Sequence, residues 1–328
     1  MDIFNPNISK VTKGVEGKTI LVYGTNRTGK TKVATSFEKP YYLPFENGLG
    51  GVSGVPTLPI QKWADFLKIN KQLTNSKTLT KAREAYQTLI FDGVESSAMM
   101  CQDFICQKHD ADSIKSGNEG YGLWSEYETE FKRQLDLLTG VGYTVIFISH
   151  EGSRKYLDDA GEEYSKIYPK GDKRSIDPIC DLCDIIAYAR VNNKDEDGNE
   201  VKSSLFLTNT NYYHAGSRFD YLPPFLKEFS AKNLEDAICS AVEKQEEMEK
   251  GGTATLAEIK LETAVEVMSF EDLKANIEKI VIGLHKAGRL QEYTDIKNEY
   301  LGADMGVKDA TKKQYQSLEM IYNDIKEL

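Results

Sequence analysis

The segment from Gly24 to Thr31 constrains this chain more than any other, because it reads G-T-N-R-T-G-K-T and fits the pattern G-x-x-x-x-G-K-[ST]. Residues 18–23 before it form an apolar run typical of a buried strand, and residues 32–37 can open a helix. A glycine-rich loop in this context turns backbone N–H groups toward phosphates. The sequence therefore predicts a phosphate-binding loop for a nucleoside triphosphate.

Within this loop, Lys30 is expected to neutralise the β- and γ-phosphates, and the Thr31 hydroxyl to ligate Mg²⁺. The expected cofactors are accordingly ATP and Mg²⁺. The residues expected to bind the nucleotide are Gly24, Thr25, Asn26, Arg27, Thr28, Gly29, Lys30, Thr31 and Lys32.

Composition is that of a globular chain without membrane segments. No apolar run reaches the length of a membrane span, and the N-terminal residues lack a signal-peptide pattern. Five cysteines, an odd number without an export signal, indicate reduced thiols and a cytoplasmic location. Cys180 and Cys183 form a lone C-x-x-C, which favours buried or incidental cysteines over a metal or redox pair. The formal net charge of −10 argues that any contact with nucleic acid comes from a local patch.

The order of apolar runs predicts an α/β fold with a mainly parallel sheet, followed by a small C-terminal helical module. We expect an α/β domain over residues 1–230, an acidic helical linker over 231–252 and the helical module over 253–328. Strands are predicted at 19–23, 41–44, 88–92, 144–149, 185–190 and 203–208. Two polar loops are expected, at 108–122 and 152–175, and loops of that length are often functional or mobile.

The C-terminal module has its own apolar periodicity. Residues 269–272 resemble a capping box with Asp in place of the usual Glu. Two helices are predicted from apolar residues at helical spacing. Those residues are Leu273, Ile277, Ile280, Val281 and Leu284, and then Tyr315, Leu318, Ile321, Tyr322 and Ile325.

Asp92, at the end of the predicted strand 88–92, is the candidate carboxylate for the Mg²⁺ shell. The next residue is Gly93, whereas ATPases of the AAA+ and helicase types usually carry a water-activating glutamate there. The candidate bases are therefore Glu46 and Glu95. We prefer Glu46, because it ends a strand that we expect beside the phosphate-loop strand, whereas Glu95 is expected to begin a helix.

His150 ends the predicted strand 144–149, where a polar side chain can hydrogen-bond the γ-phosphate. The loop that follows contains a basic stretch beside Tyr164 and Tyr168, which could stack on bases. A solvated surface loop is the alternative interpretation of this segment. The candidate DNA-binding residues are Lys166, Lys170, Lys173 and Arg174.

This order of parts resembles the RecA core. More closely, the chain resembles the phage-encoded RecA-like ATPases of the AAA_24 type, which include short-form recombinases grouped with single-strand annealing proteins. The resemblance covers about residues 15–230. It is carried by the phosphate loop and by four short segments, F-E-N-G at 45–48, G-Y-G-L-W at 120–124, I-S-H-E at 148–151 and C-D-I-I-A-Y at 183–188.

The resemblance implies that Glu46 activates water and that Asp92 supports the metal. It also implies that His150, where the family commonly has glutamine, couples the γ-phosphate to the loop behind it. RecA-like ATPases form filaments or rings in which a neighbour's basic residue completes the site. Arg218 is the candidate for that residue, with Lys194 and Arg190 as alternatives.

The function implied is ATP-dependent recombination or annealing on single-stranded DNA. The acidic C-terminal module could bind a replication or single-strand binding protein, or serve as a solubility-promoting appendage. A helicase loader, a packaging motor, a small-molecule kinase and a nucleotide-gated scaffold are the alternatives.

Overall fold

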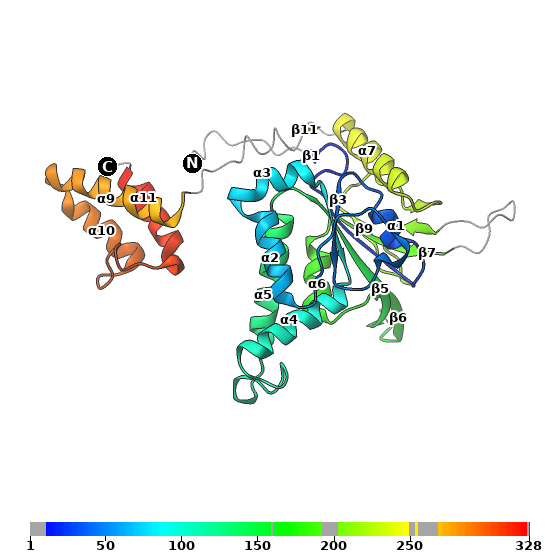
Figure 1. The fold of residues 1–328 in the computed structure, drawn as a ribbon. Helices are drawn as coiled ribbons and strands as arrows, with labels where there is room; N and C mark the ends of the chain where they lie inside the picture. Colours follow the sequence, from blue (N-terminus) through cyan, green and yellow to red (C-terminus); the bar gives the residue numbers. More distant parts are fainter. Residues whose placement is uncertain (1–10, 159, 192–202, 249–252, 255–267, 327) are drawn as a thin grey trace. The chain divides into compact units, whose positions relative to one another are not determined.

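The computed structural model describes residues 11–158, 160–191, 203–248, 253–254, 268–326 and 328 (Figure 1). The chain divides into two compact units, Met1–Glu262 and Thr263–Leu328. Among the described residues, no helix combines the length and apolar character needed to cross a membrane.

Five parallel strands form the centre of the first unit, which confirms the predicted α/β class with a mainly parallel sheet. Their order across the sheet is β7-β2-β5-β4-β3. Their bounds are β2 Thr19–Gly24, β3 Pro40–Pro44, β4 Thr88–Asp92, β5 Thr144–Leu157 and β7 Ile185–Arg190.

Shorter strands extend this sheet. On the β7 side, β8 (Ser204–Phe206) pairs antiparallel with β7, and β10 (Phe225–Leu226) pairs with β8. The two-residue strand β9 (Gly216–Ser217) pairs with the start of β7. A separate parallel pair joins β1 (Val11–Thr12) to β11 (Thr253–Ala254).

Helices cover both faces of the sheet, so its central strands are buried throughout (Figure 1). Alternate side chains of β2 enter different cores: Leu21 packs on one face, and Ile20 and Val22 pack on the other. Continuous apolar strands are expected of a parallel sheet covered in this way. The helices of the larger core are α2 Trp63–Thr74, α3 Ser76–Ala85, α4 Val94–Lys108, α5 Trp124–Thr139 and α6 Lys173–Leu182.

The opposite face is covered by α1 (Lys30–Ala34) and α7 (Ala231–Met248). The sequence predicted an acidic helical linker over 231–252; α7 is that helix, but it packs on the sheet as part of the first unit. Residues Leu234, Ile238 and Val242 follow helical spacing and are buried against the sheet. The many glutamates on the solvent side of this helix concealed its apolar stripe; residues 249–252 lie outside the described part.

The segment predicted as a loop at 152–175 is mostly a β-hairpin, so that prediction is wrong. Strand β5 continues past the sheet to Leu157, and β6 (Glu163–Pro169) pairs with it antiparallel. Tyr156 and Tyr164 face each other across the hairpin with ring centroids 5.8 Å apart. This cross-strand contact stabilises an extended structure that charge content alone did not indicate.

The second unit is a bundle of α9 (Phe270–Lys286), α10 (Leu290–Leu301) and α11 (Tyr315–Lys326). Ser269 caps α9 by accepting a hydrogen bond from the Asp272 backbone, as the capping pattern predicted. Its buried core includes six of the predicted apolar positions, Leu273, Ile277, Leu284, Leu318, Ile321 and Ile325. Short 3₁₀ turns complete the chain, with η1 Leu49–Gly51, η2 Asn118–Gly120 and η3 Lys312–Gln314.

The packing of this bundle predicts a strong effect of Leu318→Ala. Leu318 is fully buried, so the substitution should lower the free energy of unfolding of the bundle by about 2–5 kcal/mol. Met320→Ala is the control on the same helix: Met320 is 46% exposed, and a change below about 0.5 kcal/mol is expected. Urea unfolding followed by hydrogen exchange of residues 270–326 measures both. Equal losses would contradict the assigned core.

Candidate functional site

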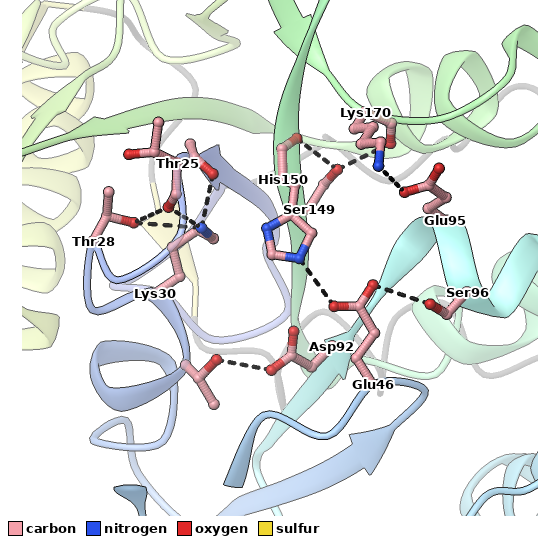
Figure 2. A network of polar contacts seen from close by, with 12 residues as sticks. Thr25, Thr28, Lys30, Glu46, Asp92, Glu95, Ser96, Ser149, His150 and Lys170 are labelled. Carbon is pink, nitrogen blue, oxygen red and sulfur yellow. Dashed lines mark hydrogen bonds and ion pairs between the residues drawn. The ribbon is translucent and has the colours of Figure 1, made fainter. Parts of the chain in front are cut away.

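The loop between β2 and α1 folds closely around the Lys30 ammonium (Figure 2). Lys30 Nζ donates to the carbonyl oxygens of Gly24 (2.8 Å) and Thr25 (2.7 Å), and lies 3.4 Å from Thr28 Oγ1. Burial lowers the pKa of Lys30 to about 8, although nearby Asp92 acts in the opposite direction. The lysine is thus held at the centre of the loop, where it was predicted to contact phosphate.

Two glycines give the loop its path. Gly24 has φ 155°, and a Cβ there would lie 2.1 Å from the carbonyl oxygen of Ala189 on β7. Gly29, directly before α1, has φ 81°, a left-handed conformation that other residues rarely adopt. Of the other predicted nucleotide ligands, Thr28 is buried, Thr31 is half-buried, and Thr25, Asn26, Arg27 and Lys32 are exposed.

Asp92, at the carboxyl end of β4, accepts two hydrogen bonds on one oxygen. Thr31 Oγ1 donates to Asp92 Oδ2 at 2.8 Å, and Tyr42 OH donates to the same atom at 2.7 Å. Burial raises the pKa of the Asp92 carboxyl, while the hydrogen bonds from Tyr42 and Thr31 lower it. A threonine hydroxyl beside a carboxylate is an oxygen donor set that suits Mg²⁺, so the residues present fit the predicted metal.

Tyr42 was missed by the sequence analysis. It lies on β3, and its hydroxyl is directed at Asp92 on the neighbouring strand β4. The only available sign was its place in the run Y-Y-L at 41–43, where either tyrosine could have faced either core. Gly48 completes this corner, because a Cβ there would lie 2.4 Å from the Tyr42 hydroxyl and 2.6 Å from Asp92 Oδ2.

Glu46 and His150 form a pair beside Asp92 (Figure 2). His150 Nε2 lies 3.0 Å from Glu46 Oε2, and Ser96 Oγ donates to Glu46 Oε1 at 3.1 Å. His150 is opposite Gly24 in the β2–β5 register, so it lies next to the first residue of the phosphate loop. The two residues predicted as water-activating base and γ-phosphate sensor are therefore in direct contact.

The route by which Glu46 reaches this site differs from the predicted one. Strand β3 does not lie beside β2, because β5 and β4 separate them. Glu46 instead follows the end of β3, where the Phe45 backbone N–H donates to the carbonyl of Asp92 and turns the chain across the end of β4. Gly93, with φ 101°, leaves room for it: a Cβ there would lie 2.5 Å from Glu46 Cγ.

Glu95, the alternative base, lies in the first turn of α4 and pairs with Lys170 at 2.8 Å. Glu46 contacts His150, whereas Glu95 points toward Lys170 (Figure 2). The geometry thus favours Glu46 as the carboxylate nearer to the phosphate loop.

Arg218 lies at the other edge of the sheet. Its backbone N–H donates to the carbonyl of Asp184 at 2.9 Å, and the Asp184 side chain accepts from the backbone of Thr19, the first residue of β2. The phosphate loop begins at the opposite end of β2, roughly 16 Å along the strand. A role for Arg218 on a neighbour's nucleotide stays a prediction. Arg190 ends β7 next to Ala189, the partner of Gly24, and Lys194 lies outside the described residues.

Of the four predicted DNA-binding residues, Lys166 lies on β6, Lys173 and Arg174 on α6, and Lys170 between these two elements. Lys166 is 8% exposed and donates to Asn209 Oδ1 at 2.8 Å, so its ammonium is already bound within the protein; its role on DNA stays a prediction. Lys170 pairs with Glu95, and Lys173 is the exposed first residue of α6. The Arg174 guanidinium lies over the Trp124 ring, 4.6 Å from its centroid.

The five cysteines, Cys101, Cys106, Cys180, Cys183 and Cys239, are free thiols. Burial raises the pKa of Cys180 to about 12 and that of Cys183 well above its usual range. Within the described residues, no three or more His, Cys, Asp or Glu side chains group as metal ligands. The C-x-x-C therefore forms part of the packing around α6.

The close approach of Gly93 and Glu46 predicts that Gly93→Ala is unusually destabilising. Gly161→Ala is the matched control, since Gly161 also has positive φ (84°) but nothing lies within 4 Å of its Cβ position. Both variants adopt a left-handed backbone at a cost of about 1–2 kcal/mol. Gly93→Ala should lose at least about 1 kcal/mol more, because its methyl group must displace Glu46. Urea denaturation measures the difference, and equal losses would contradict the contact.

Comparison with known proteins shows the family of this chain. The model of the AAA_24 family, described as an AAA domain, matches residues 16–219. The chain is also 45% identical over 328 residues to the SPbeta prophage-derived uncharacterized protein YorG of Bacillus subtilis (strain 168). That alignment covers 100% of this chain and 98% of the relative. With the match spanning the phosphate loop, Asp92 and His150, this chain belongs to the AAA_24 family of P-loop ATPases.

Proposed function

We propose that this chain is a Mg²⁺-dependent, RecA-like ATPase that binds single-stranded DNA during phage recombination or annealing in the host cytoplasm. The observation that carries the proposal is the convergence of Lys30, the Thr31–Asp92 pair and the Glu46–His150 pair at one edge of the sheet. This set provides a phosphate-binding cation, oxygen ligands for a metal and a carboxylate base. These are the parts that ATP hydrolysis on a P-loop requires.

In this proposal Lys30 exchanges its bonds to the Gly24 and Thr25 carbonyls for bonds to phosphate oxygens. Thr31 and Asp92 would hold Mg²⁺, which when bound neutralises charge on the phosphates. Tyr42 restrains the Asp92 carboxylate by donating to it, so the carboxylate keeps its orientation.

Glu46 is the proposed general base. Its carboxylate accepts hydrogen bonds from Ser96 and His150. These two bonds hold the carboxylate in one orientation. A positioned carboxylate that removes a proton from attacking water contributes about 10²–10⁴-fold to a rate. His150 is the proposed γ-phosphate sensor. It contacts Glu46, and it is paired with Gly24, the first residue of the phosphate loop, in the β2–β5 register.

The phage setting of the proposal is supported by the relative named as SPbeta prophage-derived. The RecA-like assignment is supported by the placing of β5, which bears His150, between the phosphate-loop strand and the Asp92 strand. The resemblance to RecA-like ATPases also implies a homo-oligomer. In such a filament or ring, Arg218 would act on the nucleotide of the neighbouring subunit. The 59% exposure of the Arg218 side chain and its distance from its own phosphate loop support a role in trans.

Single-stranded DNA is proposed to contact the edge formed by residues 108–124 and the start of α6. Tyr121 is 86% exposed between Gly120 and Gly122, and it presents an open ring for stacking. Nearby, Arg174 and Lys173 supply positive charge, with the Arg174 guanidinium stacked on Trp124. The C-terminal bundle is proposed to bind a replication or single-strand binding protein.

The first prediction of the proposal concerns hydrolysis. Lys30→Ala and Glu46→Gln should each lower the ATP turnover rate by about 10²-fold or more, because a phosphate ligand and the base are lost. Glu95→Gln is the matched control, since it removes a carboxylate that pairs with Lys170 instead, and its rate should stay within about twofold of wild type. Release of phosphate is the measurement. Loss of turnover in Glu95→Gln but not in Glu46→Gln would contradict the assignment of the base.

The second prediction concerns DNA. Turnover should rise with single-stranded DNA at low salt, and the binding constant should fall steeply as salt increases. Tyr121→Ala should weaken binding of an oligonucleotide by about 1–3 kcal/mol through lost stacking. Tyr212→Ala is the control, because Tyr212 is 78% exposed on a different loop. Fluorescence anisotropy measures the affinities. Turnover indifferent to DNA would favour a loader or motor, and nucleotide binding without turnover would favour a scaffold.

A further inference from the structure

One hydrogen bond joins the phosphate loop to a residue far away in the chain. Ser203, directly before β8, donates from its Oγ to the backbone carbonyl of Thr28 at 2.7 Å. Both residues are buried. A hydrogen bond in a buried environment is electrostatically stronger than one exposed to water. Ser203 therefore ties the middle of the phosphate loop to the edge of the sheet.

Ser203 is itself held in place on two sides. The Phe229 backbone N–H donates to the Ser203 carbonyl oxygen at 2.6 Å. The next residue, Ser204, begins β8 and is paired with Arg190 of β7. The Ser203 hydroxyl is thus presented to the loop from a fixed support.

The Thr28 side chain is bound inside the loop. Thr28 Oγ1 donates to the Thr25 carbonyl at 3.1 Å and lies 3.4 Å from Lys30 Nζ (Figure 2). The two ends of this residue therefore have different partners: the side chain is held by the loop, and the carbonyl is held by Ser203.

The peptide between Thr28 and Gly29 has little local restraint on its orientation. Gly29 has φ 81°, and nothing lies within 4 Å of the position that a Cβ would take. Glycine adopts positive and negative φ about equally well, so backbone sterics do not select one orientation of this peptide. A contact from outside the loop is needed to select it, and the bond from Ser203 is such a contact.

The orientation of this peptide decides what the loop offers to a phosphate. The peptide is trans, and in a planar trans peptide the carbonyl oxygen and the following N–H point in opposite directions. With the Thr28 carbonyl directed at Ser203, the Gly29 N–H is directed away from β8. Backbone N–H groups of such loops bind the α- and β-phosphates. A rotated peptide would present an oxygen to phosphate in place of a donor.

We propose that Ser203 is a positioning residue for nucleotide binding, because its hydroxyl keeps the Gly29 N–H available to the phosphates. This inference rests on the proposed function and adds to it a residue outside the phosphate loop. Ser203 acts through the Thr28 carbonyl and does not touch the nucleotide. Without the hydroxyl, the peptide would populate both orientations, and the apparent affinity would fall with the fraction that can bind.

The test compares two neighbouring serines. Ser203→Ala removes the bond to the loop. Ser204→Ala is the matched control, because Ser204 is also buried and its Oγ donates at 2.8 Å to the carbonyl of Lys227, which lies outside the loop. Calorimetric titration measures the Kd of ADP and of a non-hydrolysable imido analogue of ATP, each with Mg²⁺. Phosphate release at saturating ATP measures kcat.

Ser203→Ala should raise the Kd of both nucleotides about threefold to tenfold, which corresponds to the net contribution of one hydrogen bond. The effect should be similar for ADP and the analogue, because both carry the β-phosphate. Its kcat should stay within about twofold of wild type, since Lys30, Asp92 and Glu46 are retained. Ser204→Ala should leave both Kd values within about 1.5-fold of wild type, because its lost bond does not reach the loop.

Ser203→Cys provides a second variant if Ser203→Ala folds poorly. It keeps a side chain of similar size, but a thiol is a weak donor, so the Kd values should rise as in Ser203→Ala. Unchanged Kd values in the folded Ser203 variants would overturn the inference. Equal increases in Ser203→Ala and Ser204→Ala would also overturn it, because they would indicate a general loss of packing.

These two results leave the proposed ATPase intact, provided that wild-type protein binds both nucleotides and Lys30→Ala weakens their binding. Failure of wild-type protein to bind either nucleotide would instead overturn the proposed function together with the inference.

Discussion

The parallel register of three strands is the constraint on which the site depends. Because β2, β5 and β4 run in the same direction, their carboxyl ends lie at one edge, with Gly24 opposite His150 and Asp92 opposite Ile148. Asp92 is 61 residues from Thr31 along the chain, and the pairing of β2 with β5 brings His150 beside Gly24. Helices on both faces keep these strands buried, so the register is fixed by packing as well as by hydrogen bonds.

Much of this arrangement could be predicted from the sequence, because local patterns carried the information. The phosphate loop, the five parallel strands and the end position of Asp92 follow from short motifs and apolar runs. Glu46 was expected near the phosphate loop for an incorrect reason, since β3 lies two strands further from β2 than expected, and its contact with His150 was not predicted. Strand order is a non-local property, and no single run of residues encodes it.

Other features depended on tertiary contacts that a sequence pattern does not display. The apolar stripe of α7 is narrow, and the glutamates beside it are typical of a solvated linker. In the structure, however, Leu234 and Ile238 pack against the sheet. The hairpin of β5 and β6 reads as a charged loop because its residues alternate between ion pairs and stacked tyrosines. Tyr42 and Gly93 matter through the neighbours they touch, Asp92 and Glu46, and their own identity gave no sign of that role.

The carbonyl oxygens of Gly24 and Thr25 compete with an incoming anion for the Lys30 ammonium. To bind Lys30 Nζ, an anion must replace the two carbonyl oxygens to which the ammonium already donates. A lone phosphate ion offers little in exchange, whereas a polyphosphate also gains the backbone N–H groups of the loop and the Thr31 hydroxyl. We therefore expect the loop to favour chains of phosphates over single phosphate ions.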